Sequence, residues 1–213
     1  MSGLLQFSER SLGALNVSEG SKTAATPHTL GERLVRRCRE SETMRREQKI
    51  VAVGAASGIA VMAASLWGLT RLLPQPLIAD VVAERLAYAV KANIIAVLPL
   101  FVMLAAIGNA RFLSDAIDPT RRAESRSMEI DGRVADNTLQ QNFVFTVASL
   151  ALSTVVPVQR LQVVWACAIV FVAARVVFWF GYRINPLYRA PGMAATAYLN
   201  LGIIVYVIYR LIG

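Results

Sequence analysis

Polar residues at helical spacing open one long apolar stretch of this sequence and indicate a binding site. The residues are Arg133, Asn137, Gln140 and Gln141. Intervals of four, seven and eight residues from Arg133 would put all of them on one face of a helix. A guanidinium can bind a carboxylate through two parallel hydrogen bonds, and amides can bind a peptide backbone. This face therefore predicts an anionic, peptide-like ligand.

A second polar group closes the next apolar stretch. Its members are Arg175, Tyr182, Arg183, Asn185 and Arg189. Charged residues within apolar stretches are costly in a membrane, so their positions indicate either a function or a specific structural bond. For Arg175 and Asn137 the alternative to ligand binding is a hydrogen bond to a neighbouring helix. The residues alone leave both interpretations open.

The sequence has too few histidines and cysteines to build the common metal and catalytic sites. His28 is the only histidine, and Cys38 and Cys167 are the only cysteines. They cannot make a common zinc or copper site or a Ser-His-Asp device, and the sequence has no glycine-rich phosphate loop. The net charge of +8 could suggest nucleic acid, but the basic residues flank long uncharged stretches, as in membrane proteins. We therefore expect no metal and no nucleic acid as partners.

Membrane-spanning helices are the elements predicted to position these residues. The chain has 213 residues, of which 55% are hydrophobic and 17% charged, and this is too apolar for an ordinary soluble domain. A spanning helix needs about 20 apolar residues, and the apolar stretches are continuous rather than alternating. The predicted spans are 50–69, 92–110, 137–159, 161–182 and 190–209. The predicted fold class is an all-α integral membrane bundle of about five transmembrane helices.

Small residues and a proline refine this prediction. Gly54 and Gly58 form a small-x-x-x-small pair, which lets two helices approach closely. We expect the first span to pack against the outside of the other helices through this pair. Pro99 lies inside the second span and is expected to kink it.

Basic residues are distributed unevenly between the two sides of the predicted bundle. The side that carries the N-terminal tail has sixteen Lys and Arg residues, and the opposite side has five, with Arg175 inside a span left out. Cytoplasmic segments of membrane proteins carry the excess of such residues. The N-terminus is therefore predicted to be cytoplasmic, with the C-terminus on the other side.

The N-terminal tail is polar. Residues 1–28 are expected to be disordered, whereas Thr29 to Glu32 resembles a capping box that could start a helix over 30–49. That helix is interpreted either as a solvated charged helix or as a basic helix on anionic lipid. Membrane lipids are thus a predicted partner.

Two motifs resemble those of the MAPEG superfamily, the membrane-associated proteins of eicosanoid and glutathione metabolism. The match to its third-helix signature consists of Ala174–Tyr182, Asn185-Pro186 and Arg189-x-x-Gly192. Arg133-x-x-x-Asn137-x-x-Gln140 resembles its second-helix motif, Arg-x-x-x-Asn-x-x-Glu. The resemblance covers roughly 93–213. The five-span layout with a Gln-Gln pair is also similar to mattrin, a vertebrate branch of the superfamily.

The resemblance implies a protomer of four helices, usually in a homotrimer, with glutathione bound between protomers near the cytoplasmic face. The implied division of the chain is a basic cytoplasmic tail at 1–49, an extra transmembrane helix with its connecting loop at 50–91 and a MAPEG-like four-helix domain at 92–213. Glutathione would be a co-substrate.

The resemblance also assigns roles to individual residues. Arg133 and Asn137 match glutathione-binding residues, and Gln140 stands at the position of the family's acid. Arg175, from the second polar group, is predicted to bind the same glutathione. Tyr182 and Arg189 are the implied catalytic residues, with Arg189 stabilising the glutathione thiolate because a guanidinium stays charged and lowers the thiol pKa from about 8.5.

Departures from the family pattern leave the activity open. Gln140 stands where the family has Glu, and Gln141 and Phe178 stand where the leukotriene-synthase branch has tyrosines. One hypothesis is a glutathione-dependent transferase or peroxidase acting on lipophilic electrophiles. The alternative is a non-catalytic MAPEG-fold scaffold or interaction protein. A transporter or channel has little support, because no acidic residue lies within a predicted span.

Overall fold

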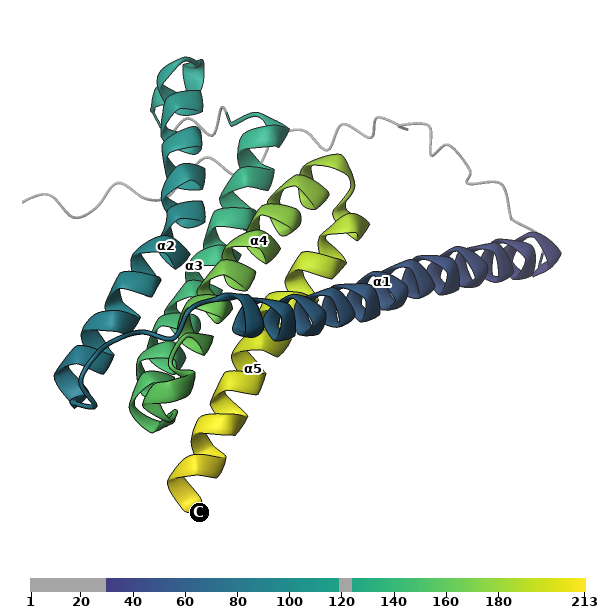
Figure 1. Cartoon of the computed structure of the whole chain (residues 1–213). Helices are drawn as coiled ribbons and strands as arrows, with labels where there is room; N and C mark the ends of the chain where they lie inside the picture. Colours follow the sequence, from purple (N-terminus) through teal and green to yellow (C-terminus); the bar gives the residue numbers. More distant parts are fainter. Residues whose placement is uncertain (1–29, 119–123) are drawn as a thin grey trace, which may run out of the picture. The chain divides into compact units, whose positions relative to one another are not determined.

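The computed structural model describes residues 30–118 and 124–213. This part of the chain is all-helical (Figure 1). Its long helices are α1 (Leu30–Leu72), α2 (Val82–Phe112), α3 (Arg126–Val155), α4 (Val163–Ile184) and α5 (Ala190–Ile212). Residues 41–213 form one compact unit, and every contact described below lies within it. The prediction of disorder for 1–28, and Thr29 of the predicted capping box, fall outside the described residues.

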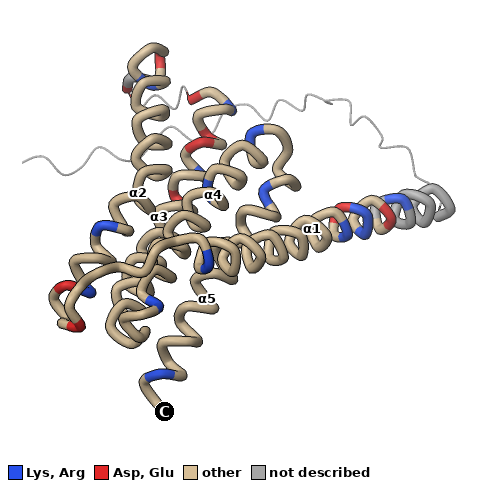
Figure 2. Tube along the Cα trace, viewed as in Figure 1, with Lys and Arg blue, Asp and Glu red and all other residues tan. Residues whose placement is uncertain are grey.

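Most of these helices are long and apolar enough to cross a membrane. In the described residues four segments qualify: Ser41–Leu72, Val82–Phe112, Val158–Ile184 and Pro186–Ile212. The helix α3 is not among them, because its first half carries several charged and amide side chains where the other helices are apolar. Figure 2 shows charged residues near the helix ends and long uncharged lengths between them. The prediction of an all-α membrane bundle is therefore confirmed, with α3 as its most polar helix.

A bundle of α2, α3, α4 and α5 forms the core. Small residues allow close approach of the helices, and Ala89, Ala92, Ala96 and Ala168 are all at most 1% exposed. Larger side chains fill the centre, where the rings of Phe145 on α3 and Phe171 on α4 stack with their centroids 4.6 Å apart. Close packing of buried side chains gives helices fixed positions relative to one another.

Polar side chains of α3 connect it to α2. Asn142 donates from Nδ2 to the carbonyl oxygen of Ala96 on α2 over 2.9 Å. Ser149 and Asn93 are joined by a hydrogen bond of 2.9 Å. In an apolar surrounding a buried amide or hydroxyl without a partner is costly, so these bonds fix which face of α3 turns inward.

The end of α3 is capped from another helix. Its last carbonyl groups have no partner within the helix, and Arg85 of α2 donates to two of them, Ser153 and Val156. A cation at this position also matches the negative end of the helix dipole. Arg85 thereby fixes the position of α2 relative to the last turn of α3.

The helix α1 is one continuous helix and touches α5 at a narrow crossing. A Cβ atom on Gly58 would lie 2.2 Å from the carbonyl oxygen of Pro191, and one on Gly54 would lie 3.3 Å from Cδ of Pro191. The predicted packing of the first span through this pair is thus confirmed, and its partner is Pro191 in the first turn of α5. The charged residues 41–49 and the apolar residues after them belong to the same helix.

The connections gather at two ends of the unit. Figure 1 shows the α2–α3 and α4–α5 connections at one end, and the start of α2, the α3–α4 connection and the C-terminus toward the other. The α1–α2 loop runs from the end of α1 at Leu72, beside the middle of the bundle in Figure 1, to the start of α2 at Val82. The polar residues predicted to bind a ligand lie toward the first of these ends, at the start of α3 and the end of α4.

Candidate functional site

A buried guanidinium lies at the centre of the polar residues. Arg175 of α4 is 0% exposed. It donates from Nη1 to Oδ1 of Asn137 on α3 over 2.9 Å, and from Nη2 to Oγ1 of Thr196 on α5. Its carbon Cζ also lies 4.6 Å from the ring centroid of Phe178. Arg175 therefore holds α3, α4 and α5 together at one depth.

The close approach of α4 and α5 depends on Gly192. A Cβ atom there would lie 2.5 Å from both the carbonyl oxygen of Ala174 and the backbone nitrogen of Phe178. Nη2 of Arg175 is 3.4 Å from the carbonyl oxygen of Gly192. Glycine at position 192 thus lets the backbone of α5 come close to the guanidinium of Arg175. The groups around this guanidinium are neutral oxygens and an aromatic ring rather than a carboxylate.

Asn137 is oriented by this bond. Its Oδ1 accepts from Arg175, and within the described part of the chain its Nδ2 group makes no hydrogen bond. The residue is half-buried. The amide oxygen of Asn137 therefore faces the interior of the bundle, and its two N–H donors remain for another group.

Tyr182 and Arg189 form a pair at the turn between α4 and α5. Nη1 of Arg189 donates to the hydroxyl of Tyr182 over 3.2 Å, and Cζ of Arg189 lies 5.1 Å from the centroid of the same ring. Tyr182 is 8% exposed, whereas Arg189 is exposed. The buried ring thus supports an accessible guanidinium at this end of the bundle.

The turn that brings this pair together is fixed by local interactions. Asn185 accepts a hydrogen bond at Oδ1 from the backbone N–H of Leu187 over 2.9 Å, and Pro186 starts the short 3₁₀ turn Pro186–Arg189. Gly181 makes room for the returning chain, because a Cβ there would lie 2.4 Å from the carbonyl oxygen of Tyr188. These residues explain why Arg189 folds back onto Tyr182.

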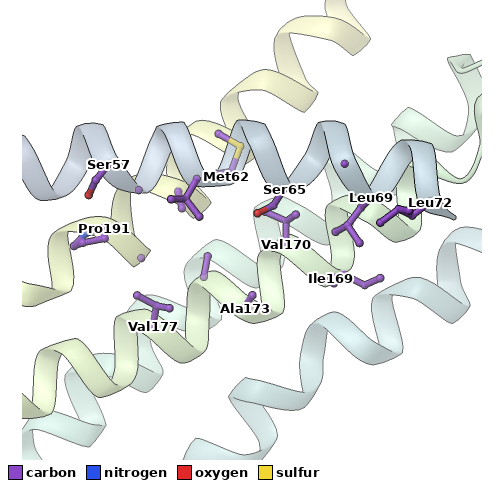
Figure 3. Close-up of a pocket in the computed structure, with 16 residues that line it drawn as sticks. Ser57, Met62, Ser65, Leu69, Leu72, Ile169, Val170, Ala173, Val177 and Pro191 are labelled. Carbon is purple, nitrogen blue, oxygen red and sulfur yellow. The ribbon is translucent and has the colours of Figure 1, made fainter.

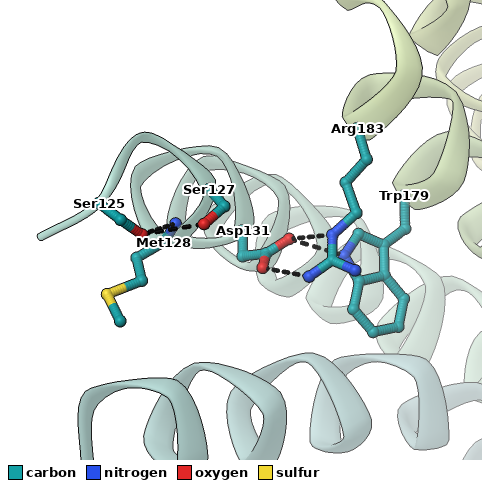
Figure 4. Close-up of polar contacts among 6 residues, drawn as sticks. All are labelled: Ser125, Ser127, Met128, Asp131, Trp179 and Arg183. Carbon is teal, nitrogen blue, oxygen red and sulfur yellow. Dashed lines mark hydrogen bonds and ion pairs between the residues drawn. The ribbon is translucent and has the colours of Figure 1, made fainter. Parts of the chain in front are cut away.

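A buried carboxylate that the sequence analysis missed lies near this turn (Figure 4). Asp131 of α3 is 5% exposed and accepts three hydrogen bonds, two from Arg183 at 2.8 and 2.6 Å and one from Nε1 of Trp179 at 2.9 Å. Burial raises the pKa of Asp131, but the hydrogen bonds and the charge of Arg183 outweigh it, so that the pKa lies below its ordinary value. This group links the start of α3 to the end of α4.

A signal for Asp131 was present in the sequence. It precedes Thr138 by seven residues and Asn142 by eleven, and all three are buried on the same face of α3. Its partners are 48 and 52 residues away, however, and no pattern in the sequence pairs them. Asp131 also lies before the predicted span 137–159, so it did not stand out as a polar residue within the membrane.

The four polar residues predicted to share one face of α3 divide into two directions. Asn137 and Gln141 turn toward other helices, and Gln141 accepts at Oε1 from Asn200 of α5 over 3.0 Å. Arg133 and Gln140 are exposed. Arg133 forms an ion pair of 2.6 Å with Glu129, in which both side chains are more than half exposed, and such surface pairs are weak.

Within one chain the predicted site residues thus form two groups. One group contains the Arg175–Asn137 pair and the Tyr182–Arg189 pair, whose members Arg175 and Tyr182 lie about two turns apart on α4. Phe178 lies between them and packs edge to face with Tyr182, with ring centroids 5.9 Å apart. Arg133 and Gln140 lie on the outward face of α3. No group of His, Cys, Asp and Glu in the described residues could hold a metal ion.

A comparison with protein-family models decides the family. Residues 78–209 match the model of the MAPEG family, and this is more than half of the chain. The chain belongs to the MAPEG family. The matched region covers α2, α3, α4 and most of α5, and α1 lies before it.

Family membership has a direct consequence for the fold. This MAPEG-family protein is a multi-pass integral membrane protein, and its family unit consists of the last four helices. Searches of curated proteins and of solved structures gave no match. The roles of the individual site residues therefore depend on the geometry described above.

Proposed function

We propose that this MAPEG-family protein binds glutathione and adds its thiolate to lipophilic electrophiles that enter from the bilayer. The observation that carries the proposal is the pair of Arg189 and Tyr182, joined over 3.2 Å. An accessible guanidinium held against a buried phenol offers a fixed positive charge and a hydroxyl donor at one point. Both features stabilise a thiolate.

The other predicted residues suit the remainder of the tripeptide. Arg133 can exchange its weak surface pair with Glu129 for a carboxylate of glutathione. The free N–H groups of Asn137 suit a carbonyl or carboxylate oxygen. Gln140 can accept from the amino group, although an amide does so with less energy than the carboxylate usual in the family.

Arg175 takes a positioning role in this proposal. Its side chain is fully buried, so it acts on the ligand through Asn137 rather than by contact. This differs from the direct contact with the ligand that was predicted for Arg175 from the sequence. The hydrogen bond from Nη1 selects the orientation of the Asn137 amide in which the donors point away from α4.

A homotrimer would complete the site. In one chain Arg133 and Gln140 point outward from α3, next to exposed apolar residues of the same face such as Phe143 and Val147. A multi-pass membrane protein gains by covering such a mixed face with protein. In the assembly that we propose, this face of one protomer meets the Tyr182–Arg189 pair of the next.

The reaction step follows from this arrangement. The thiol proton of glutathione passes to solvent, and Arg189 stabilises the thiolate that remains. The sulfur electron pair forms a carbon–sulfur bond at the electrophile. The bond to the leaving group breaks with its electron pair, or in an epoxide the carbon–oxygen bond opens and the alkoxide takes a proton from water.

The orientation that we propose places this site at the cytoplasmic face. The α2–α3 and α4–α5 connections lie at the same end of the unit (Figure 1). The excess of basic residues on that side favours the cytoplasm, where the N-terminal tail would also lie.

The alternative proposal is a non-catalytic membrane scaffold. The observation that favours it is that several polar residues already have structural partners. Asn137 is bonded to Arg175, and Gln141 is bonded to Asn200. Gln140 also lacks the charge that the family's acid supplies.

The ultraviolet absorbance of a bound glutathione thiolate distinguishes the enzyme from the scaffold. The wild-type chain with glutathione should show this absorbance, and Arg189→Ala should lose it while keeping most of its binding. Arg126→Ala, which removes another exposed guanidinium at the same end of the unit, is the matched control and should leave the signal unchanged. Glutathione binding without any thiolate absorbance in the wild type would favour the scaffold.

A further inference from the structure

The segment from Leu187 to Gly192 lies against α4 with almost no space between the two backbones. A Cβ atom on Gly181 would overlap the carbonyl group of Tyr188, and one on Gly192 would overlap the carbonyl group of Ala174. Glycine at both positions allows this close approach. The segment therefore has no room to shift toward α4.

The helix α1 covers another side of the same segment (Figure 3). A Cβ atom on Gly58 would overlap the carbonyl group of Pro191, and one on Gly54 would lie 3.3 Å from Cδ of Pro191 and 3.4 Å from Cβ of Ala190. Figure 3 shows Pro191 next to the turn of α1 that carries Ser57. The segment is thus held by contacts from two helices.

The contact with α1 is confined to this crossing, because open space lies along α1 before and after it. After Gly58, an apolar groove of about 560 Å³ lies between α1 and α4 (Figure 3). Before Gly54, a crevice of about 470 Å³ lies between α1 and the residues Leu187 and Tyr188. The support that α1 gives to the segment therefore depends on the glycine contacts at the crossing.

Arg189 lies inside this segment, two residues before Pro191. Its Nη1 donates to the hydroxyl of Tyr182 over 3.2 Å, which is already at the upper end of the range for such bonds. Tyr182 is buried on α4, and its ring packs against Phe178. A displacement of the segment by about 0.5 Å would therefore be enough to break the bond.

We infer that α1 positions Arg189 against Tyr182, with Gly58 and Pro191 as the positioning contact. The inference rests on the proposed function, in which this guanidinium stabilises the thiolate of glutathione. In this role neither Gly58 nor Pro191 touches the ligand, because both act through the backbone that carries Arg189. Since α1 precedes residues 78–209, which match the family model, this chain adds the support to the family unit.

The variant Gly58→Leu tests this role in the full chain, with glutathione as the probe. The new side chain should displace α1 from Pro191 and leave the segment held from the α4 side only. The absorbance of bound thiolate, followed against pH, should show a rise of about one unit in the pKa of the thiol, which is a tenfold smaller ratio of thiolate to thiol.

The matched control is Gly68→Leu on the same helix, because a Cβ atom on Gly68 would have no atom within 4 Å. It should leave the pKa of the bound thiol unchanged. An unchanged pKa in Gly58→Leu, or an equal rise in both variants, would overturn the inference.

Binding of S-methylglutathione separates a positioning role from damage to the fold, because its sulfur cannot ionise. Calorimetry should give affinities within about threefold of one another for the wild type and Gly58→Leu. If Gly58→Leu loses this binding as well, Gly54→Ala replaces it, because its contact of 3.3 Å with Pro191 requires only a small shift. The thiol pKa should then rise by a smaller amount, and an unchanged value would contradict the inference.

Hydrogen exchange without glutathione keeps this inference distinct from the proposed function. The backbone amides of 187–189 should exchange faster in Gly58→Leu than in the wild type, and Gly68→Leu should leave them unchanged. Unchanged exchange in Gly58→Leu would overturn the inference whether or not glutathione binds. A wild type without thiolate absorbance would contradict the proposed function instead, and faster exchange in Gly58→Leu would still support the positioning of this segment by α1.

Discussion

Arg175 donates to Asn137 over 2.9 Å, and this bond joins a fully buried guanidinium on α4 to a half-buried amide on α3. The bond therefore brings one residue from each of the two polar groups in the sequence into direct contact. The acceptor of Asn137 is occupied from inside the bundle, and its donors remain for a ligand. A structural bond and a binding role, which stood as alternatives in the sequence, are therefore compatible at Asn137.

The first prediction concerns the stability of this bond. Asn137→Ala should lower the free energy of unfolding by about 1–3 kcal/mol, because the buried guanidinium loses an acceptor. Thermal unfolding in detergent measures the change. Gln140→Ala, three residues along the same helix and exposed, is the control and should change stability by less than about 0.5 kcal/mol. Equal effects of the two variants would mean that the bond contributes nothing specific.

The second prediction concerns pH. The pKa of Asp131 is lowered in the folded protein, so its charged form contributes stability above its unfolded pKa of about 4. That contribution is lost as the pH falls through the lower folded pKa. Asp131→Asn should therefore be less stable than the wild type at neutral pH, with a difference that narrows in acid.

Unfolding followed from pH 7 toward the acid limit of the assay measures this narrowing. Glu129→Gln is the matched control, because Glu129 pairs with Arg133 on the exposed surface of the same helix. Its effect at neutral pH should stay below about 1 kcal/mol. A constant difference between Asp131→Asn and the wild type at every pH would contradict the assigned role of the carboxylate.

The third prediction concerns the crossing of α1. Gly58→Ala puts a methyl group where the backbone of Pro191 lies, so α1 must move away from α5. The distances between nitroxide labels on α1 and α5, measured by pulsed electron paramagnetic resonance, should lengthen, or their distribution should broaden. Gly68→Ala, which meets open space on the same helix, should leave them unchanged, and a shift of equal size in that variant would argue against the crossing.

The fourth prediction concerns topology. A cysteine placed at Asp118 should react with a membrane-impermeant maleimide only when the cytoplasmic side is accessible. One placed at Gln75, in the α1–α2 loop, should react from the outer side of intact cells. The native Cys38 and Cys167 are replaced by serine and alanine in both variants. Labelling of the Asp118 position from outside would reverse the proposed orientation.

Several elements of the fold could be predicted because they depend on neighbours along the chain. Continuous apolar stretches gave the helices, and the spacing of Gly54 and Gly58 gave the close approach of α1. The partner in that approach, Pro191, could not be predicted, since it depends on how α5 is placed. The spacing within α3 likewise showed a shared face but not that Gln140 points outward while Gln141 bonds Asn200.

The candidate site shows the same limit. The resemblance to the family proposed Tyr182 and Arg189 as the residues at a thiolate, and the turn between them brings the two into contact. Asp131 escaped notice because its role depends on Trp179 and Arg183, which reach it from another helix. A contact across helices has no fixed interval in sequence, so only the folded chain reveals it.

The fifth prediction concerns the acid that the family motif has and this chain lacks. Gln140→Glu should tighten glutathione binding by about one to two decades, from a charge-assisted hydrogen bond regained at about 1.4 kcal/mol per decade. Gln141→Glu is the neighbouring control and should not tighten binding, because its side chain is bonded to Asn200. An equal gain in both variants would indicate a general effect of negative charge.

Whether glutathione binds at all can be measured by calorimetry on the purified full chain. We expect heat of binding for the wild type at up to millimolar glutathione, tighter binding for Gln140→Glu, and weaker binding for Arg133→Ala. Absence of heat at millimolar glutathione in both the wild type and Gln140→Glu would contradict a glutathione site, and with it the proposed enzyme.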